Sequence, residues 1–137
     1  MNDKFFIDSN IILYGFSKDL FKKEIVKTLI RANPLISIQV VNEIINVLLK
    51  KFHFSIKDVK EVLNFLKLKT KITNLKLESI ELALFIKEKY KYSYYDSLII
   101  ASALENDCTI LYSEDMQHTQ VIEGKLKIIN PFKQQKL

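Results

Sequence analysis

Four acidic residues lie where a predicted strand ends or a predicted helix begins: Asp8, Glu43, Asp96 and Asp115. A carboxylate that is buried at such a place without a partner is unfavourable. No lysine or arginine adjoins Asp8, Glu43 or Asp96 in the sequence. If the fold brings the four carboxylates together, a divalent cation is the simplest partner for them, and the chain would then be a metal-dependent enzyme.

The type of ligand indicates both the ion and its chemistry. Two like charges about 4 Å apart repel by roughly 4 kcal/mol at an effective dielectric constant of 20. An ion that relieves this repulsion must prefer oxygen ligands, which favours Mg²⁺, with Mn²⁺ as a substitute. The sequence has no Cys or His cluster that would favour Zn²⁺. Such a site suits the hydrolysis of phosphodiester bonds, with one ion or two.

The elements that position these acids are short strands alternating with helices. Runs of large apolar residues predict strands at 4–8, 35–38, 109–112 and 126–129, and helical spacing of apolar residues predicts helices at 19–32, 39–52, 55–66, 77–90 and 94–106. Residues 67–74 suit a strand or an extended connector, and 116–123 suit a short helix that Gly124 ends. This alternation predicts an α/β fold, a three-layer α/β/α sandwich with a central, mostly parallel sheet of four to five short strands.

Binding sites in such sheets form beyond the carboxyl ends of the strands. Asp8 ends the first strand, before a turn predicted at 9–10, and Asp115 follows the strand at 109–112. Glu43 lies in the first turns of the helix after the second strand, and Asp96 begins a helix that feeds a strand. The sequence therefore predicts all four acids on one rim. Taken singly, each also has a structural interpretation, because acids favour turns and helix N-termini.

Composition narrows the class of protein. The chain has 137 residues, of which 48% are hydrophobic, with two glycines and two prolines. This suits one compact domain, which we expect to span residues 1–137 with a flexible tail in the last few. The single cysteine, Cys108, has no partner for an internal disulfide. Without a cleavable signal or an apolar run of about 18 residues, we expect a cytoplasmic protein with no membrane partner.

The charge of the chain fits nucleic-acid binding without establishing it. The net charge is +5 with a pI near 9.2, and Arg31 is the sole arginine. Contacts to phosphates would therefore come from lysine ammonium groups. Lys60 and the lysines within 67–71 form a candidate face for a nucleic-acid backbone. The alternative is a solvated surface that keeps the protein soluble.

Four short motifs resemble those of PIN-domain ribonucleases, most closely toxins of the VapC type from type II toxin–antitoxin systems. They are Phe6-Ile7-Asp8-Ser9-Asn10, Val41-Asn42-Glu43-Ile44, Asp96-Ser97-Leu98-Ile99-Ile100-Ala101 and Ser113-Glu114-Asp115. The resemblance covers essentially the whole length of the chain. In the third motif the family commonly has alanine after the aspartate, where this chain has Ser97.

The resemblance implies roles for the residues in these motifs. The implied catalytic residues and Mg²⁺ ligands are Asp8, Glu43, Asp96 and Asp115. Asn10 and Ser113 would support them, Ser113 by orienting Asp115 or a metal-bound water. The fourth acid often acts through water in this family, and Glu114 would face solvent. The resemblance also implies an RNA substrate, a small cognate antitoxin that blocks the cleft, and a homodimer.

Two other functions stay open on the sequence. One is a catalytically inactive PIN-like module that binds RNA or a protein partner. The other is a phosphatase with an aspartyl nucleophile, which usually has a second aspartate two residues after the first, where this chain has Asn10. The target of a nuclease also stays open between transfer, ribosomal and messenger RNA and single-stranded DNA.

Histidines and tyrosines near the motifs have competing interpretations. His53 suits a C-terminal cap of its helix, and His118 either touches substrate or lies in a loop without a role. A group of tyrosines precedes Asp96: Tyr90, Tyr92, Tyr94 and Tyr95. They could stack on bases, pack inside the domain or form a dimer contact.

Overall fold

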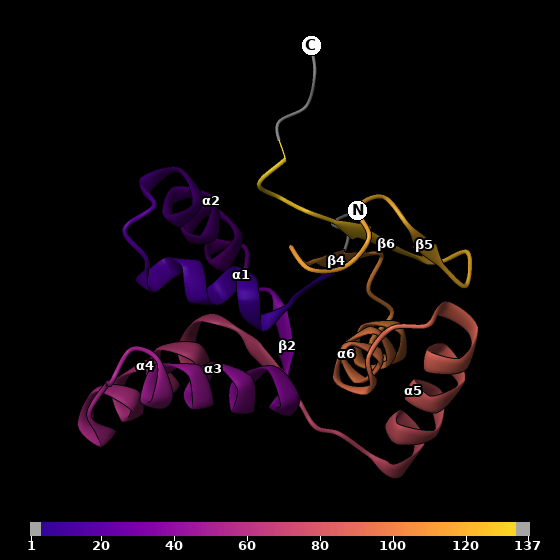
Figure 1. Cartoon of the computed structure of the whole chain (residues 1–137), viewed down its shortest axis with the longest axis horizontal. Coiled ribbons are helices and arrows are strands. Elements are labelled where there is room, and N and C mark those ends of the chain that lie inside the picture. Colours follow the sequence, from indigo (N-terminus) through magenta and orange to yellow (C-terminus); the bar gives the residue numbers. More distant parts are fainter. Residues whose placement is uncertain (1–3, 134–137) are drawn as a thin grey trace.

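The computed structural model of the protein describes residues 4–133 (Figure 1). The helices of this part are α1 (Ser9–Leu13), the 3₁₀ helix η1 (Tyr14–Phe16), α2 (Leu20–Arg31), α3 (Ile38–Lys50), α4 (Ile56–Lys69), α5 (Leu77–Tyr90) and α6 (Tyr94–Glu105). The strands are β1 (Phe5–Ile7), β2 (Leu35–Ser37), β3 (Lys71–Thr73), β4 (Ile110–Tyr112), β5 (Val121–Ile122) and β6 (Leu126–Ile129). The flexible tail expected at the C-terminus falls on 134–137, outside the described residues.

Within residues 4–133, six strands form one sheet in the order β3-β2-β1-β4-β6-β5. Neighbouring strands run parallel, except that β5 pairs antiparallel with β6. In the central register, Phe6 lies opposite both Leu35 of β2 and Leu111 of β4. The chain leaves β1 toward β2 on one side and returns to β4 on the other. The carboxyl ends of β1 and β4 thus form the point where the strand order reverses, which is where ligand sites form in such sheets.

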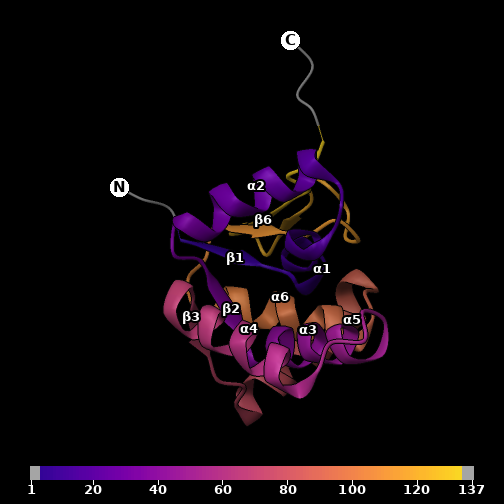
Figure 2. The same ribbon diagram turned by 90° about the vertical axis from the view of Figure 1, so that its left-hand side faces the viewer.

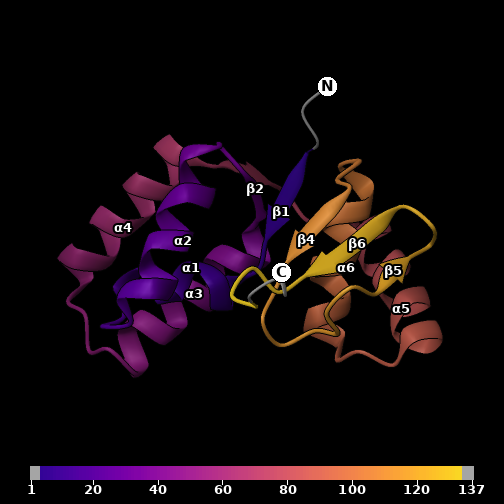
Figure 3. The same cartoon turned by 90° about the horizontal axis from the view of Figure 1, so that it is seen from above.

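Helices cover both faces of the sheet. Figure 1 shows α1 to α4 on one side of β2 and α5 and α6 on the other. The view from above in Figure 3 shows the same two groups, with the strands between them. In Figure 2, α2 and α6 lie on opposite sides of β1 and β6. The α/β fold and its three layers, which the sequence predicted, are confirmed, with six strands where four to five were expected.

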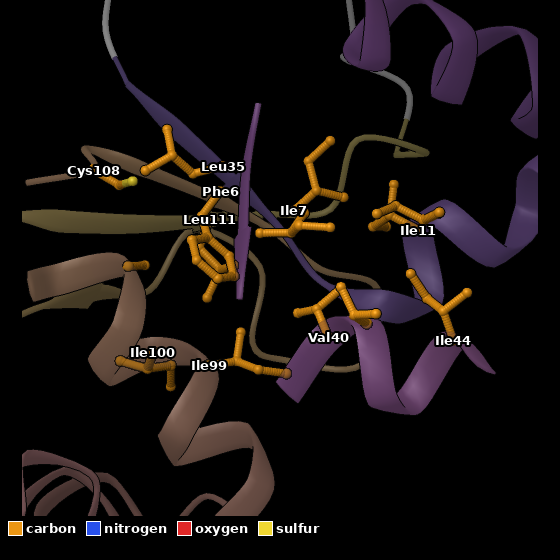
Figure 4. Packing of buried hydrophobic residues seen from close by; sticks show 14 of the residues in the cluster. Phe6, Ile7, Ile11, Leu35, Val40, Ile44, Ile99, Ile100, Cys108 and Leu111 are labelled. Atoms are coloured by element: carbon orange, nitrogen blue, oxygen red, sulfur yellow. The ribbon is translucent and has the colours of Figure 1, made fainter. Parts of the chain in front are cut away.

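The core lies between the central strands and the helices on both faces. Figure 4 shows members of the two layers in contact with the strands, among them Phe6, Ile7, Ile11, Val40, Ile44, Ile99, Ile100 and Leu111. Residues Ser97 to Ala103 of α6 are all buried. A helix surrounded by other elements has no polar face, which explains why the sequence of α6 is mostly apolar. Within residues 4–133, no helix combines the length and the apolar character that crossing a membrane requires.

The chain after Asp8 forms a helix where the sequence predicted a turn. Asp8 has extended backbone angles (φ −73°, ψ 157°), and its side chain accepts a hydrogen bond from the Ser9 N–H, so it is the N-cap of α1. Ile11 and Ile12 of this short helix are buried. Ser9 and Asn10 are common in turns, but an aspartate followed by apolar residues that can reach the core starts a helix equally well.

The segment 116–123 does not form the predicted short helix. Val121 and Ile122 form β5, which pairs with β6. Glu123 and Gly124 have φ angles of 51° and 66° in the turn between the strands, as type I′ hairpin turns require. The Lys125 N–H donates to the Ile122 carbonyl at 3.0 Å and closes this turn. Pairing with β6 decides the conformation here, because strand preference depends on the neighbouring strand.

For residues 67–74, the strand interpretation is correct at 71–73, and neither interpretation is correct at 67–69, which are helical. The helix α4 continues to Lys69, three residues beyond the predicted end, and β3 follows at Lys71–Thr73. Thr70 marks the boundary, with its hydroxyl donating to the Leu66 carbonyl at 2.7 Å.

Ser97→Ala is expected to raise the free energy of unfolding by about 1 kcal/mol. The Ser97 side chain is fully buried, and its hydroxyl has no hydrogen-bond partner within residues 4–133. Removing an unpaired buried hydroxyl removes its desolvation penalty and leaves a good helix former. Urea denaturation measures the effect. Ser37→Ala is the contrasting control, because the equally buried Ser37 hydroxyl caps α3 by accepting from the Val40 N–H at 3.3 Å, and its loss should destabilise. A loss of stability in Ser97→Ala would contradict the expectation.

Candidate active site

The four predicted acids come from segments that the sheet brings to one edge. Asp8 follows β1, Asp115 follows β4, Glu43 lies in the second turn of α3, and Asp96 lies in the first turn of α6. Repulsion reaches Asp8 from Asp96 and Glu43, and it reaches Asp96 from Glu43 and Asp115. The structure thus brings the four carboxylates within electrostatic range of one another, at the edge where the sequence placed them. We call this group the rim acids.

Asp8 is held by donors on both carboxylate oxygens. Oδ1 accepts from the Ser9 backbone N–H at 2.7 Å, and Oδ2 accepts from the Ser113 hydroxyl at 2.8 Å. Asn10 Nδ2 lies 3.4 Å from Oδ2. The Asp8 N–H donates to the Tyr112 carbonyl at 2.9 Å, which joins the ends of β1 and β4. The side chain is 2% exposed, so its position is set by the packed ends of the central strands.

The environment of Asp8 opposes its ionisation. The pKa of Asp8 is raised from 3.8 to about 7, chiefly by burial and also by repulsion from Asp96 and Glu43, while the hydrogen bonds from Ser113 and Ser9 oppose the shift. None of the salt bridges found within residues 4–133 involves a rim acid. At neutral pH the Asp8 carboxyl therefore takes up a proton in a large share of molecules unless a cation balances it.

Glu43 has a donor on each carboxylate oxygen. The Ser9 hydroxyl donates to Oε1 at 2.7 Å, and Gln39 Nε2 donates to Oε2 at 3.0 Å. Gln39 lies one turn before Glu43 on α3, a spacing that places both side chains on the same face of the helix. Ser9 also lies 3.4 Å from Asp8 Oδ1. The Ser9 hydroxyl, whose single proton is donated to Glu43, therefore lies between the first and second rim acids.

Asp115 is linked to the other rim acids through Asn10. Asn10 Nδ2 donates to Asp115 Oδ2 at 3.0 Å, and Asn10 Oδ1 accepts from the Glu114 N–H at 3.3 Å. Asp115 is exposed, unlike Asp8. The single amide of Asn10 thus contacts two consecutive residues of the loop after β4. The supporting role of Asn10 stays a prediction.

Asp96 lies at the start of the buried helix α6. Its N–H donates to the hydroxyl of the N-cap residue Ser93 at 3.1 Å. Burial raises the pKa of Asp96, with further repulsion from Glu43 and Asp115, against the hydrogen bond to Ser93. The positive end of the helix dipole partly offsets this penalty. The helix therefore presents a half-buried carboxylate toward the rim.

The donor chemistry of the rim suits a hard divalent cation. All four rim acids supply oxygen atoms, and their mutual repulsion would be relieved by a positive charge. In this conformation, however, no group of three or more His, Cys, Asp or Glu side chains within residues 4–133 is spaced as the ligands of one ion. The hydroxyl of Ser9 and the amide of Asn10 instead lie between pairs of carboxylates. An ion would have to replace some of these contacts.

Two residues of the site were not singled out in the sequence. Gln39 could have been found, because it precedes Glu43 by one helical turn. Ser9 was interpreted as a turn residue, and its bond to Glu43 joins residues 34 positions apart. A contact of this range has no local signal, since it depends on how α1 and α3 pack.

Several neighbouring residues have structural contacts. His118 Nδ1 accepts from the Asn130 N–H at 2.9 Å, which attaches the loop after β4 to the end of β6. Tyr92 OH donates to Gln120 Oε1, and Tyr94 packs against the small apolar cluster of Ala83, Leu98 and Ala101. We expected Glu114 to face solvent. Its carboxylate instead accepts hydrogen bonds from Tyr14 and Lys22.

His53 and Tyr95 complete the set of residues with competing interpretations. His53 follows the end of α3 with a φ angle of 55°, beyond the C-cap residue Lys51. Tyr95 is 58% exposed next to Asp96, whereas Tyr90 OH is bonded to Glu123. Of the four tyrosines, Tyr95 therefore keeps the most ring surface available for a base.

An apolar groove of about 1130 Å³ lies away from the rim, between α2 and α4. Its lining includes Phe16, Phe54 and Phe65 but none of the rim acids. A large apolar pocket is the usual first candidate for a binding site. Here the titratable groups with raised pKa values gather elsewhere, so the chemistry is assigned to the rim and not to this groove.

The family model and the similar solved structures agree on the fold of the chain. The family model of the PIN domain matches residues 5–123. A toxin–antitoxin complex from Klebsiella pneumoniae is similar to the chain with a TM-score of 0.68 at 22% identity, covering 92% of this chain and 96% of that one. VapC20, a Sarcin–Ricin loop cleaving toxin of Mycobacterium tuberculosis, is similar with a TM-score of 0.65 at 16% identity, covering 82% and 90%.

A third similar structure is VapBC2 from Rickettsia felis bound to a DNA fragment from its promoter. Its TM-score is 0.64 at 14% identity, with 90% of this chain and 96% of that one covered. No curated protein sequence matches the chain. At these identities the structural likeness shows the fold, while the family model carries the assignment.

Proposed function

The chain belongs to the PIN domain family, and on this premise we propose that it is a Mg²⁺-dependent endoribonuclease, the toxin of a toxin–antitoxin pair. The observation that carries the proposal is the rim itself. Four carboxylates from four separate segments converge there, and one of them, Asp8, is 2% exposed with a pKa raised to about 7. A stable protein keeps such a costly group where a bound cation offsets it or where function needs it.

The residues of the rim have distinct roles in this proposal. Asp8, Glu43 and Asp96 hold the ion, and Asp115 holds it directly or through water. A bound Mg²⁺ supplies charge stabilisation at the scissile phosphate and a more acidic water. Ser113 and the Ser9 N–H orient Asp8, and Ser9 Oγ and Gln39 orient Glu43. Asn10 keeps Asp115 next to Asp8.

RNA is the proposed substrate because of the charge of the chain and the chemistry of the rim. The chain has a net charge of +5, and lysines supply almost all of its positive charges. Lysine ammonium groups bind a phosphate backbone as point charges. Binding of this kind weakens strongly as salt rises. The similar VapC20 of Mycobacterium tuberculosis is described as a Sarcin–Ricin loop cleaving toxin. For this chain we propose RNA as a class and leave the sequence that it cleaves open.

A small antitoxin and a second copy of the chain are the proposed partners. The similar proteins from Klebsiella pneumoniae and Rickettsia felis are described as complexes of toxin and antitoxin. We propose that the protein is cytoplasmic. The antitoxin would cover the rim there until the antitoxin is removed. Growth arrest on expression of the chain, relieved by co-expression of a small protein encoded beside it, would support the pair. Sedimentation of the purified chain tests the homodimer.

A catalytically inactive PIN-like module that binds RNA or a protein is the second candidate. One observation favours it, since the rim acids are not spaced as the ligands of one ion within residues 4–133. Isothermal titration with Mg²⁺ and Mn²⁺ separates the two functions. Binding of either ion at the rim supports the nuclease, and the absence of binding supports the inactive module.

The activity test uses the purified full chain and a labelled RNA. We expect cleavage that requires Mg²⁺ or Mn²⁺, stops completely in EDTA and weakens as salt rises. Mapping the new RNA ends then defines the target. Cleavage that continues at the same rate in excess EDTA would contradict the metal dependence, and intact RNA under all conditions would contradict the nuclease.

A further inference from the structure

Glu114, between the two motif residues Ser113 and Asp115, makes contacts outside the rim. Its Oε1 accepts from the Tyr14 hydroxyl at 2.6 Å, and its Oε2 pairs with Lys22 Nζ at 2.7 Å. The side chain of Glu114 is 25% exposed and that of Lys22 is 24% exposed. Both carboxylate oxygens of Glu114 are therefore bonded, one of them to a cation.

The partners of Glu114 come from separate parts of the chain. Tyr14 begins η1, Lys22 lies in the first turn of α2, and Phe132 follows β6. Lys22 Nζ lies 4.2 Å from the centre of the Tyr14 ring and 5.0 Å from that of Phe132. The Tyr14 and Phe132 rings pack edge to face, with their centroids 5.0 Å apart. Cation–π and edge-to-face contacts of this kind hold a cluster in one arrangement. We call Tyr14, Lys22, Glu114 and Phe132 the anchor cluster.

The backbone of Glu114 is attached to the rim while its side chain is attached to the anchor cluster. The Glu114 N–H donates to Asn10 Oδ1 at 3.3 Å. On one side of it, Ser113 donates to Asp8 at 2.8 Å, and on the other, Asp115 accepts from Asn10 at 3.0 Å. A change in the position of Glu114 would therefore move both neighbours relative to Asp8.

Electrostatics explains why this loop needs an anchor. Asn10 Nδ2 lies 3.0 Å from Asp115 Oδ2 and 3.4 Å from Asp8 Oδ2, so two carboxylates share one amide, and like charges on them push the loop that carries Asp115 away from the rim. Asp115 itself is exposed and has little packing to oppose that repulsion. A second carboxylate in the loop would increase the repulsion, but Lys22 balances the charge of Glu114. Glu114 can thus hold the loop without adding net charge near the rim.

We propose that Glu114, through Tyr14 and Lys22, is a positioning residue that holds Ser113 and Asp115 against the rim. This inference rests on the proposed nuclease function and deepens it. Glu114 touches neither substrate nor ion. It acts through the loop after β4, so its loss should weaken metal binding more than it weakens RNA binding.

The test is Glu114→Gln. The amide is neutral and has one acceptor oxygen where the carboxylate has two, so the ion pair with Lys22 is lost, and the Tyr14 hydroxyl must accept from the NH₂ group if Lys22 keeps the oxygen. We expect the Kd for Mn²⁺ to rise about 10-fold and kcat/KM for RNA cleavage to fall about 10-fold, as is usual for residues that orient ligands. The KM for RNA should be unchanged, and excess Mn²⁺ should restore the rate. Lys22→Met should behave like Glu114→Gln, and Lys22→Arg should keep near wild-type Mn²⁺ affinity.

Glu123→Gln is the matched control. Glu123 pairs with Lys89 at 2.6 Å and accepts from the Tyr90 hydroxyl at 2.7 Å, so it belongs to a second Lys–Glu–Tyr cluster. It lies in the turn before β6, at the amino end of that strand, and makes no hydrogen bond to a rim acid within residues 4–133. The substitution likewise removes the negative charge of a Lys–Glu–Tyr cluster, and we expect the Mn²⁺ affinity and the cleavage rate to stay at wild-type values.

Hydrogen exchange of the metal-free protein tests the anchoring separately from the chemistry. The backbone amides of 113–117 should exchange faster in Glu114→Gln than in wild type or Glu123→Gln. Unchanged exchange there, or a Kd for Mn²⁺ equal to that of wild type, overturns the positioning role alone. Wild-type protein that neither binds Mn²⁺ nor cleaves RNA overturns the proposed function and, with it, this role. An equal loss of Mn²⁺ affinity in Glu123→Gln would show a general loss of stability and also overturn the role.

Discussion

Replacing Asp96 with asparagine is expected to lower kcat/KM for RNA cleavage by at least about 10³-fold, equivalent to about 4 kcal/mol of transition-state stabilisation. The substitution removes a negative charge from a half-buried position that Glu43 and Asp115 also face. Asparagine keeps the size of the side chain, so the fold should remain. Asp8→Asn should have a comparable effect on the rate. Initial rates of the purified variants on one RNA in saturating Mg²⁺ measure the loss.

Asp58→Asn is the control for this experiment. Asp58 occupies the same place in α4 as Asp96 does in α6, because the N–H of each donates to the serine N-cap of its helix at 3.1 Å. The control therefore repeats any effect on the helix N-terminus without touching the rim. We expect it to retain full activity. Full activity of Asp96→Asn, with circular dichroism like that of wild type, would contradict the proposed nuclease.

The stability of the metal-free protein should fall as pH rises from the unfolded pKa of Asp8, 3.8, to its folded pKa of about 7. The pKa of Asp8 is raised from 3.8 to about 7 in the folded chain, chiefly by burial. Between these two values the folded state binds more protons than the unfolded state, so the free energy of unfolding decreases with pH. Above the folded pKa the penalty reaches its full size, at most about 4 kcal/mol for a shift of this magnitude. Urea denaturation in EDTA, at about pH 5 and about pH 8, measures it.

Asp8→Asn should remove most of this dependence, because its amide does not ionise. We expect the variant to be more stable than wild type at about pH 8 in EDTA, and to differ little from wild type at about pH 4. Mg²⁺ should stabilise wild type at the higher pH and leave the variant nearly unchanged, since a ligand that binds the folded state stabilises it. Asp58→Asn should follow the wild-type curve. A variant less stable than wild type at about pH 8 would contradict the burial of an uncompensated charge at Asp8.

Much of the fold could be predicted because its long elements have strong local patterns. The apolar run of α6 and the spacing of apolar residues in α2, α3 and α5 match helices within a few residues. The failures are short elements. The helix α1 has five residues and β5 has two, too few for a periodic pattern to develop. Their conformations depend on burial of Ile11 and on pairing with β6.

The positions of the rim acids could be predicted for a different reason. In a parallel sheet, each strand end and each start of a returning helix lies on one edge. Knowing the element that precedes or follows each acid was therefore enough to place Asp8, Glu43, Asp96 and Asp115 together. Their contacts could not be predicted in the same way. Ser9 to Glu43 spans 34 positions and Tyr14 to Glu114 spans 100.

Sequence alone thus determined the kind of groups at the rim and the edge where they lie, since residue types and strand order carry that information. Tertiary structure decided the rest. It buried Asp8 and raised its pKa, it placed Ser9 and Asn10 between carboxylates, and it turned Glu114 from the rim toward Lys22. Burial, repulsion and hydrogen bonding depend on distances between distant segments. Such distances exist only after the layers have packed.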